Sequence, residues 1–252
     1  MLLLFIIYHK VLYDSFYKTI SEENKKNIIF YGVKEKIQTK PSIYEYELPI
    51  YNKELQEKKY NESSAFYHIY ENKLHHYLSY IGFAQYDMII NNDVLNTVKN
   101  LISKNPGKSI IFASFFAIEE SKINLHGSLR LISEPLPIFG SILDNYNRFF
   151  STNYKRDDII KMPWIMCNTF IIPVNMYEKY MTWLSAYFTQ EINQEELCRI
   201  CFANYGFLDN GHMNINRGHL IEICTGLFLA IEVLEGVAIQ YIDIDHEHAA
   251  RV

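Results

Sequence analysis

Short runs of continuously apolar residues constrain the fold of this chain more than any other feature of its sequence. The first run covers Leu2 to Tyr8, the second covers Ile28 to Val33, and a third, YIGFAQY, covers Tyr80 to Tyr86. Short runs without polar alternation are typical of strands that are buried on both faces of a parallel sheet. Because a polar crossover joins the first two runs, the chain is predicted to begin with a βαβ unit.

Segments with a helical spacing of apolar residues alternate with these runs. We predict helices over 62–77, 94–102, 177–188 and 219–234, with Asn92 and Asp93 as N-cap candidates of the second. Further strands are predicted over 109–115, 168–174 and 237–242, whereas 34–59 is predicted to be a loop and 118–161 to be irregular. The alternation predicts an α/β fold with a mixed, mostly parallel sheet flanked by helices, in a single domain over 1–252.

Charge and cysteine content narrow the class of protein. Lys and Arg number 24 against 29 Asp and Glu, giving a formal net charge of -5, and this disfavours nucleic acid as a partner because phosphate binding depends on clustered cations. Four cysteines are too few to cross-link a chain of 252 residues by disulfide bonds, which favours a reducing compartment. No stretch approaches the roughly 18 apolar residues that span a bilayer, so we expect a cytoplasmic protein without a transmembrane segment.

Two carboxylates stand out by their position. Asp87 follows the third apolar run directly, and ligands of open α/β sheets gather outside the carboxyl ends of strands. A turn or helix-initiating aspartate explains the same pattern. Glu222 lies in the apolar segment HLIEICTGLFLAIE, where burial tends to raise the pKa of a carboxyl group toward the range of a general base. Pairing with Arg217 or His219 is the structural alternative.

The end of the chain carries a D-x-D-H-x-H cluster. Its members are Asp243, Asp245, His246 and His248, which are oxygen and imidazole ligands suited to Mn²⁺, Mg²⁺ or Zn²⁺. Charged chain ends are also commonly just solvated. The C-R-I-C segment, Cys198 to Cys201, lacks a familiar zinc spacing and is interpreted as part of a helical core.

Five segments, in order along the chain, carry a resemblance to a known family. They are the strand ending in Tyr8-His9-Lys10, NESSAFYHIYEN at 61–72, YIGFAQYDM at 80–88, NTFIIPVNMYEKYMTWL at 168–184, and the buried helix with Glu222. Together they resemble a family of polysaccharide-biosynthesis glycosyltransferases with a GT-A-like fold, found in capsule and surface-glycan clusters.

The resemblance implies a nucleotide-sugar-binding half, 1–115, and an acceptor-side half, 116–252. The donor would be UDP-, GDP- or dTDP-linked, and the acceptor would be a glycan. Donor-binding roles are implied for His9, Gly32, Glu62, Asn72, Tyr86 and Asp87. Asn168 and His219 would line the pocket of the sugar or acceptor, and Glu222 would be the base of an inverting transfer.

The sequence departs from the family at one place. The family commonly has a basic pair after the strand tyrosine, whereas this chain has Tyr86-Asp87. This difference favours a metal-dependent diphosphate site in which Asp87 and His246 or His248 bind Mn²⁺ or Mg²⁺. Three alternatives stay open: a retaining mechanism, a non-catalytic nucleotide-sugar or glycan-binding module, and a metal-binding protein centred on DIDHEH and C-R-I-C.

Overall fold

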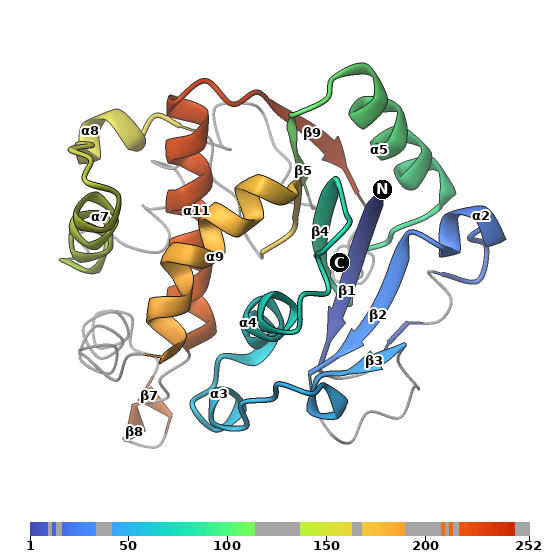
Figure 1. Ribbon diagram of the computed structural model, residues 1–252, viewed down its shortest axis with the longest axis horizontal. Coiled ribbons are helices and arrows are strands. Elements are labelled where there is room, and N and C mark those ends of the chain that lie inside the picture. The colour runs from blue at the N-terminus through green and yellow to red at the C-terminus, as the bar shows by residue number, and fades with distance from the viewer. Residues whose placement is uncertain are drawn as a thin grey trace.

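A mixed sheet forms the centre of the molecule (Figure 1). The computed structural model describes residues 1–9, 12–13, 17–33, 42–113, 137–162, 168–189, 208–209, 212–213 and 217–244. Within these ranges the sheet has seven strands, in the order β3-β2-β1-β4-β6-β5-β9. Its strands are β1 (Leu2–Tyr8), β2 (Ile28–Gly32), β3 (Ile43–Tyr44), β4 (Tyr80–Gln85), β5 (Ser109–Ala113), β6 (Phe170–Pro173) and β9 (Ile239–Asp243). β6 is antiparallel to β4 and β5, and the other pairings are parallel, which confirms the predicted mixed, mostly parallel sheet.

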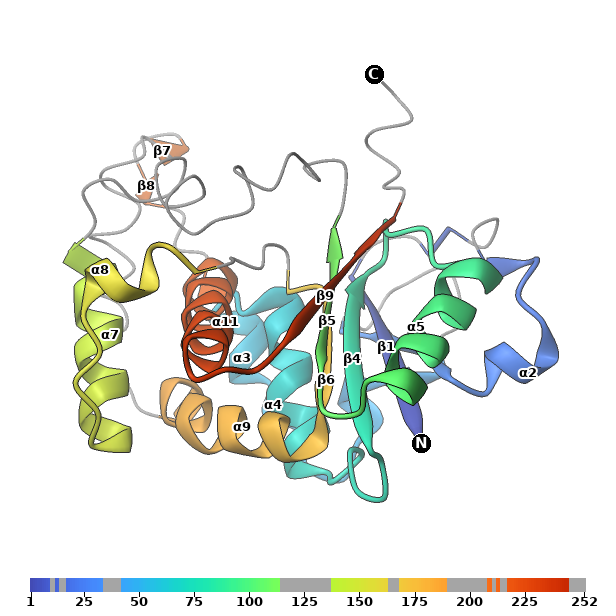
Figure 2. The same ribbon diagram turned by 90° about the horizontal axis from the view of Figure 1, so that it is seen from above.

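Helices cover both faces of this sheet. They are α2 (Glu22–Lys25), α3 (Glu54–Glu57), α4 (Ser64–Glu71), α5 (Asn92–Lys104), α7 (Pro137–Phe150), α8 (Arg156–Ile159), α9 (Val174–Thr189) and α11 (Arg217–Leu234). Figure 2 shows α2 and α5 on one side of the sheet and α4, α9 and α11 on the other, with α7 and α8 outside α11. Two 3₁₀ turns, η1 (Glu45–Glu47) and η2 (Asn61–Ser63), precede α4, and a small antiparallel pair joins β7 (Leu208–Asp209) to β8 (His212–Met213).

Strand β1 shows how one apolar run serves two cores. Alternate side chains of a strand point to opposite faces, so Leu4 and Ile6 pack toward α5 while Phe5 and Ile7 pack toward α4 and α9. All four are buried, as the sequence predicts for a strand covered on both sides. Gly82 in β4 permits this packing, because a Cβ atom there would lie 2.6 Å from Ile171 Cγ1. None of the helices in the described ranges has the length and apolarity needed to cross a membrane.

Two segments that the sequence predicted as loop or irregular contain regular structure. Short elements interrupt 34–59, where β3, η1 and α3 lie, and α7 and α8 lie in 118–161. Within 118–161 the structure describes 137–161, and there the prediction was wrong: Pro137 does not break the chain but is the first residue of α7, a position that proline fits well. Asn91, rather than Asn92 or Asp93, caps α5, since its side chain accepts a hydrogen bond from the Val94 N–H.

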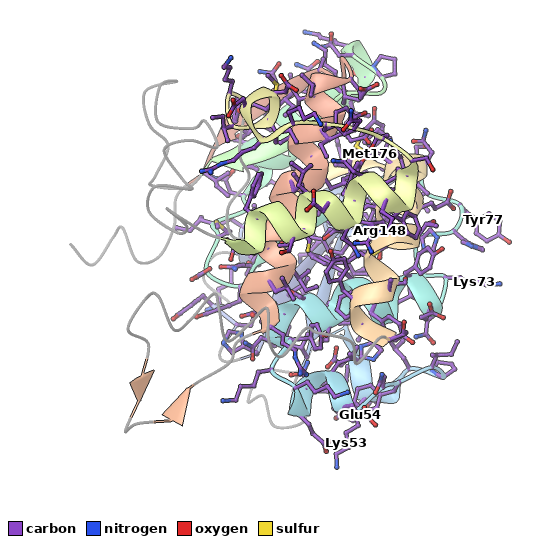
Figure 3. All side chains as sticks on the ribbon, turned by 90° about the vertical axis from the view of Figure 1, so that its left-hand side faces the viewer. Lys53, Glu54, Lys73, Tyr77, Arg148 and Met176 are labelled. Carbon is purple, nitrogen blue, oxygen red and sulfur yellow. The ribbon has the colours of Figure 1, made fainter. Side chains whose placement is uncertain are left out.

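Helix α4 is shorter than predicted. It ends at Glu71, and the chain then turns through Lys73 and Tyr77, which have φ angles of 57° and 67°. These left-handed conformations stop a helix, and the apolar spacing up to 77 continues only as a turn. Figure 3 shows the side chains of both residues pointing away from the molecule.

Candidate functional site

The carboxyl ends of β1 and β4 meet at a switch in the order of strands. From β1 the chain passes to β2 and β3 on one side, and then returns to the other side of β1 with β4. Crevices outside the carboxyl ends of strands at such a switch are the usual ligand sites of open α/β sheets. Because β6 is antiparallel and Phe170 pairs with Phe83, the residues just before β6 lie at the same edge. This edge therefore gathers residues from both halves of the sequence.

His9 and Glu62 come together at this edge. His9 is the first residue after β1, Glu62 lies in η2, and His9 Nδ1 contacts Glu62 Oε1. The side chains are 15% and 21% exposed, so both reach the surface while the contact itself is largely shielded. The contact is an ion pair whenever the imidazole is protonated.

Tyr86 and Asp87, directly after β4, extend the contact to a second strand. The rings of His9 and Tyr86 meet edge to face with centroids 5.3 Å apart, and Tyr13 stacks on Tyr86 at 6.1 Å. Asp87 is buried, and its charge adds to the burial that raises the pKa of Tyr17 well above its usual value. We refer to His9, Glu62, Tyr86 and Asp87 as the carboxyl-edge cluster; it combines carboxylates, an imidazole and aromatic rings.

Asn168 links this edge to the C-terminal half of the chain. It lies just before β6 in a left-handed conformation with φ 46°. Its Oδ1 accepts a hydrogen bond of 2.8 Å from Thr225 Oγ1 in α11, and its Nδ2 donates to Ser63 Oγ in η2 at 3.4 Å. The Tyr180 hydroxyl lies 2.7 Å from Thr225 Oγ1. The amide of Asn168 thus joins α11 to the residue that follows Glu62.

Glu222 lies on α11, one helical turn before Thr225, so the two side chains share a side of the helix. It is half-buried. The start of α11 packs against the segment before Glu62, where the Gly218 N–H donates to the Lys59 carbonyl at 3.2 Å. The helix that bears Glu222 therefore adjoins the turn that bears Glu62. His219 lies in the first turn of α11, but its side chain is outside the described part of the structure.

The two remaining donor-site predictions have different outcomes. Gly32 ends β2 and pairs with Tyr8, so it lies at the same edge as His9. Asn72 follows α4, which runs back toward the amino ends of the strands, and its side-chain amide donates to the Ile50 carbonyl at 2.7 Å and accepts from the Ile50 N–H at 2.9 Å. Asn72 thus anchors a loop, and the structure does not bring it to the carboxyl-edge cluster.

Comparison with models of protein families, with curated proteins and with solved structures gives no match.

The predicted metal ligands are only partly described. Within the described ranges, no group of three or more His, Cys, Asp and Glu residues could hold a metal ion. Asp87 is the one predicted ligand whose side chain is placed; His246 and His248 lie outside the described residues, as do Cys198 and Cys201. The structure thus supplies one carboxylate toward the predicted site.

Three residues of this edge were missed from the sequence: Tyr13, Ser63 and Thr225. Thr225 carried a usable signal, because it is a polar residue within the apolar helix segment HLIEICTGLFLAIE. A buried hydroxyl requires a partner, and here that partner is Asn168. Tyr13 and Ser63 gave no such signal, since tyrosine and serine are common in half-buried positions of any fold.

Proposed function

We propose that the protein is a glycosyltransferase that moves a sugar from a nucleotide-sugar donor to a hydroxyl group of a glycan acceptor, with inversion at the anomeric carbon and assistance from Mn²⁺ or Mg²⁺. The observation that carries the proposal is the carboxyl-edge cluster at the switch between β1 and β4. The mixed sheet is compatible with a GT-A-like fold, which is the fold that the sequence resemblance implies.

The chemistry of the edge suits such a ligand. Carboxylates and an imidazole hydrogen-bond to sugar and ribose hydroxyls, and aromatic rings stack on planar bases or cover the apolar face of a sugar. Tyr13 and Tyr86 supply the rings, and His9 and Glu62 supply the polar groups. We place the donor at these residues and the acceptor toward α11 and Asn168.

Glu222 is the residue to which we assign the proton transfer. In a single displacement, the acceptor hydroxyl loses its proton to Glu222 while its oxygen bonds to the anomeric carbon and the nucleoside diphosphate leaves with the electron pair of the broken bond. A carboxylate on a largely apolar helix is suited to this role, because an apolar environment favours its protonated form.

The proposed cation would act on the leaving group. A metal would neutralise the charge that develops on the leaving diphosphate. Of the predicted metal ligands the structure places Asp87, beside the hydroxyl-bearing Tyr17, and the described residues hold no group of three or more candidate ligands. No step is therefore assigned to the cation, and donor binding with and without it is part of the test.

Binding is the first measurement. Thermal unfolding would be followed with UDP, GDP, dTDP and CMP, each with Mn²⁺ and with EDTA. A ligand at about 100 times its Kd stabilises by roughly 2.7 kcal/mol, which shifts Tm by roughly 5–10 °C in a chain of this size. A shift with one nucleotide that requires Mn²⁺ supports the proposal in full, and a metal-independent shift removes the cation from it. No shift with any nucleotide contradicts a nucleotide-sugar donor.

The second measurement tests Glu222. Glu222→Gln should lower the transfer rate about 10²–10⁴-fold, as expected for the loss of a general base, while nucleotide binding and Tm stay unchanged. Glu235→Gln is the matched control, since Glu235 is exposed just beyond the other end of α11. Full activity of Glu222→Gln would remove Glu222 from the mechanism. Donor binding by the wild type without turnover on a broad acceptor panel would instead support a non-catalytic binding module.

A further inference from the structure

A fully buried carboxylate lies beneath the turn that bears Glu62. Glu45, the first residue of η1, has no solvent-exposed surface, and neither do Ser64 and His68, which contact it from α4. Glu45 Oε1 accepts a hydrogen bond of 2.7 Å from Gln56 Nε2, and Oε2 lies 2.8 Å from Ser64 Oγ and 3.0 Å from His68 Nδ1. We call Glu45, Gln56, Ser64 and His68 the Glu45 network.

The histidine of this network is neutral. His68 Nε2 accepts a hydrogen bond of 2.9 Å from the backbone N–H of Asn52, so it carries no proton. The ring proton is therefore on Nδ1 and is donated to Glu45. In the described ranges no Lys or Arg contacts Glu45, and both of its carboxyl oxygens have hydrogen-bond partners.

Glu45 affects the pKa of a neighbouring tyrosine. Burial raises the pKa of the Tyr31 hydroxyl well above its ordinary value, and the charge of Glu45 raises it further. A buried carboxylate without a cation is costly, and exchanging such groups for apolar ones is often neutral or stabilising. Packing alone therefore gives no reason for a carboxylate at position 45.

The network holds the backbone on both sides of Glu62. Gln56 Nε2 lies 3.2 Å from the carbonyl oxygen of Asn61, and Ser64 Oγ lies 2.9 Å from the same oxygen. Asn61 and Ser64 are thus fixed to a common buried group, and Glu62 lies between them. Its side chain leaves this anchored turn to contact His9.

The turn that bears Glu62 also contains unfavourable backbone conformations. Lys59 and Asn61 adopt left-handed conformations with φ angles of 59° and 51°, which cost roughly 1–2 kcal/mol for a residue with a side chain. Conformations of this kind persist when surrounding contacts determine them, and they concentrate at functional sites. The hydrogen bonds on the Asn61 carbonyl are contacts of this kind.

We propose that the Glu45 network is a positioning device that fixes Glu62 against His9, and so sets the orientation of the His9 imidazole at the ligand edge of the sheet. Its value for catalysis rests on the proposed transferase function; its effect on His9 does not. Gln56, Ser64 and Glu45 act here through Glu62 and touch no substrate.

The test reads the His9 ring directly. Imidazole ¹⁵N resonances would be recorded for the full chain, with the His9 signals identified by their loss in His9→Gln. Glu62→Gln gives the pattern expected when the contact is lost. Ser64→Ala and Gln56→Met remove hydrogen bonds to the Asn61 carbonyl while changing the volume little, and both should move the His9 signals toward the Glu62→Gln pattern. The signals of exposed His76 should stay in place in both variants.

Asn24→Ala is the matched control. Asn24 is buried in another polar network on α2, so its loss lowers stability without touching the turn of Glu62. Unchanged His9 signals in both Ser64→Ala and Gln56→Met would overturn the proposal, as would equal movement in Asn24→Ala.

Activity separates this proposal from the transferase proposal. Given transfer by the wild type, Ser64→Ala and Gln56→Met should lower kcat/KM roughly 10- to 100-fold, the range expected for a slightly displaced group, and Asn24→Ala should not. If the His9 signals move in the two variants but the wild type transfers no sugar, the transferase proposal is contradicted and the positioning role stands. If the wild type transfers sugar but the His9 signals do not move, the positioning role is contradicted and the transferase proposal stands.

Discussion

Two buried polar networks stabilise opposite ends of this molecule by different chemistry. At the amino end of β2, the Asn24 network joins α2 to α5 through Asn24, Asn92, Asn96 and Lys99. At the other end lies the Glu45 network beneath η2. Asn24 is neutral, and its one charged partner, Lys99, is only half-buried and keeps contact with water. The carboxyl group of Glu45 is fully buried.

The two networks serve different purposes. An amide network between two helices is explained by stability alone, because the buried Asn24 amide finds partners for both its donor and its acceptor atom at little cost of desolvation. A buried carboxylate gives no comparable gain in stability, so its presence beside the carboxyl-edge cluster points to a requirement for geometry. The two networks should therefore respond differently to the loss of their central residue.

Glu45→Ala should show the largest effect. It removes one acceptor of Gln56 and of Ser64 and leaves the buried His68 Nδ1–H without its partner, so we expect the free energy of unfolding to fall by about 3–5 kcal/mol. Urea unfolding at pH 7 measures this loss. A loss below about 1 kcal/mol would show that water or a rearrangement replaces the carboxylate readily, and the contrast between the networks would disappear.

Asn24→Ala should lower the free energy of unfolding less than Glu45→Ala does, and it should leave nucleotide affinity unchanged. The Asn92 and Asn96 side chains lie near the surface and can turn to water, so we expect a loss of about 1–3 kcal/mol. Nucleotide affinity, measured by calorimetry on the same sample, should not change. A tenfold loss of affinity would mean that the Asn24 network also supports the ligand edge, and the two networks would no longer differ in purpose.

The strands of the large sheet other than β3 could be predicted from the sequence because their signal is local. β1, β2 and β4 are continuous apolar runs, and a strand buried on both faces has no other simple pattern. The antiparallel pairing of β6 with β4 could not be predicted in the same way, since it depends on which residues meet across about ninety positions of chain. This pairing is what brings Asn168 to the ligand edge.

The Glu45 network could not be predicted from the sequence for a related reason. Glu45 and Gln56 lie in a polar segment that the sequence predicts as a loop, and polar residues that bury one another have the same composition as a solvated loop. His9, Glu62 and Tyr86 were found because motifs of the resembled family include them. Their contact with one another, and the network beneath it, required the structure.

His75 offers the smallest and most specific test of the comparison, because it is a second buried histidine in the turn that follows α4. Burial lowers its pKa below the ordinary value of about 6.5, nearby His76 lowers it further, and Glu178, 3.6 Å from Nε2, opposes the shift. The unfolded chain therefore binds a proton between about pH 7 and 5 that the folded chain does not bind, and stability is lost as the pH falls.

Replacing His75 by Phe should remove this part of the pH dependence, since the ring can still stack on Tyr70. The measurement is the free energy of unfolding of both proteins in urea at pH 7.5, 6.5 and 5.5, and the gap between them should change in favour of His75→Phe as the pH falls. Parallel profiles would show that His75 titrates alike in both states.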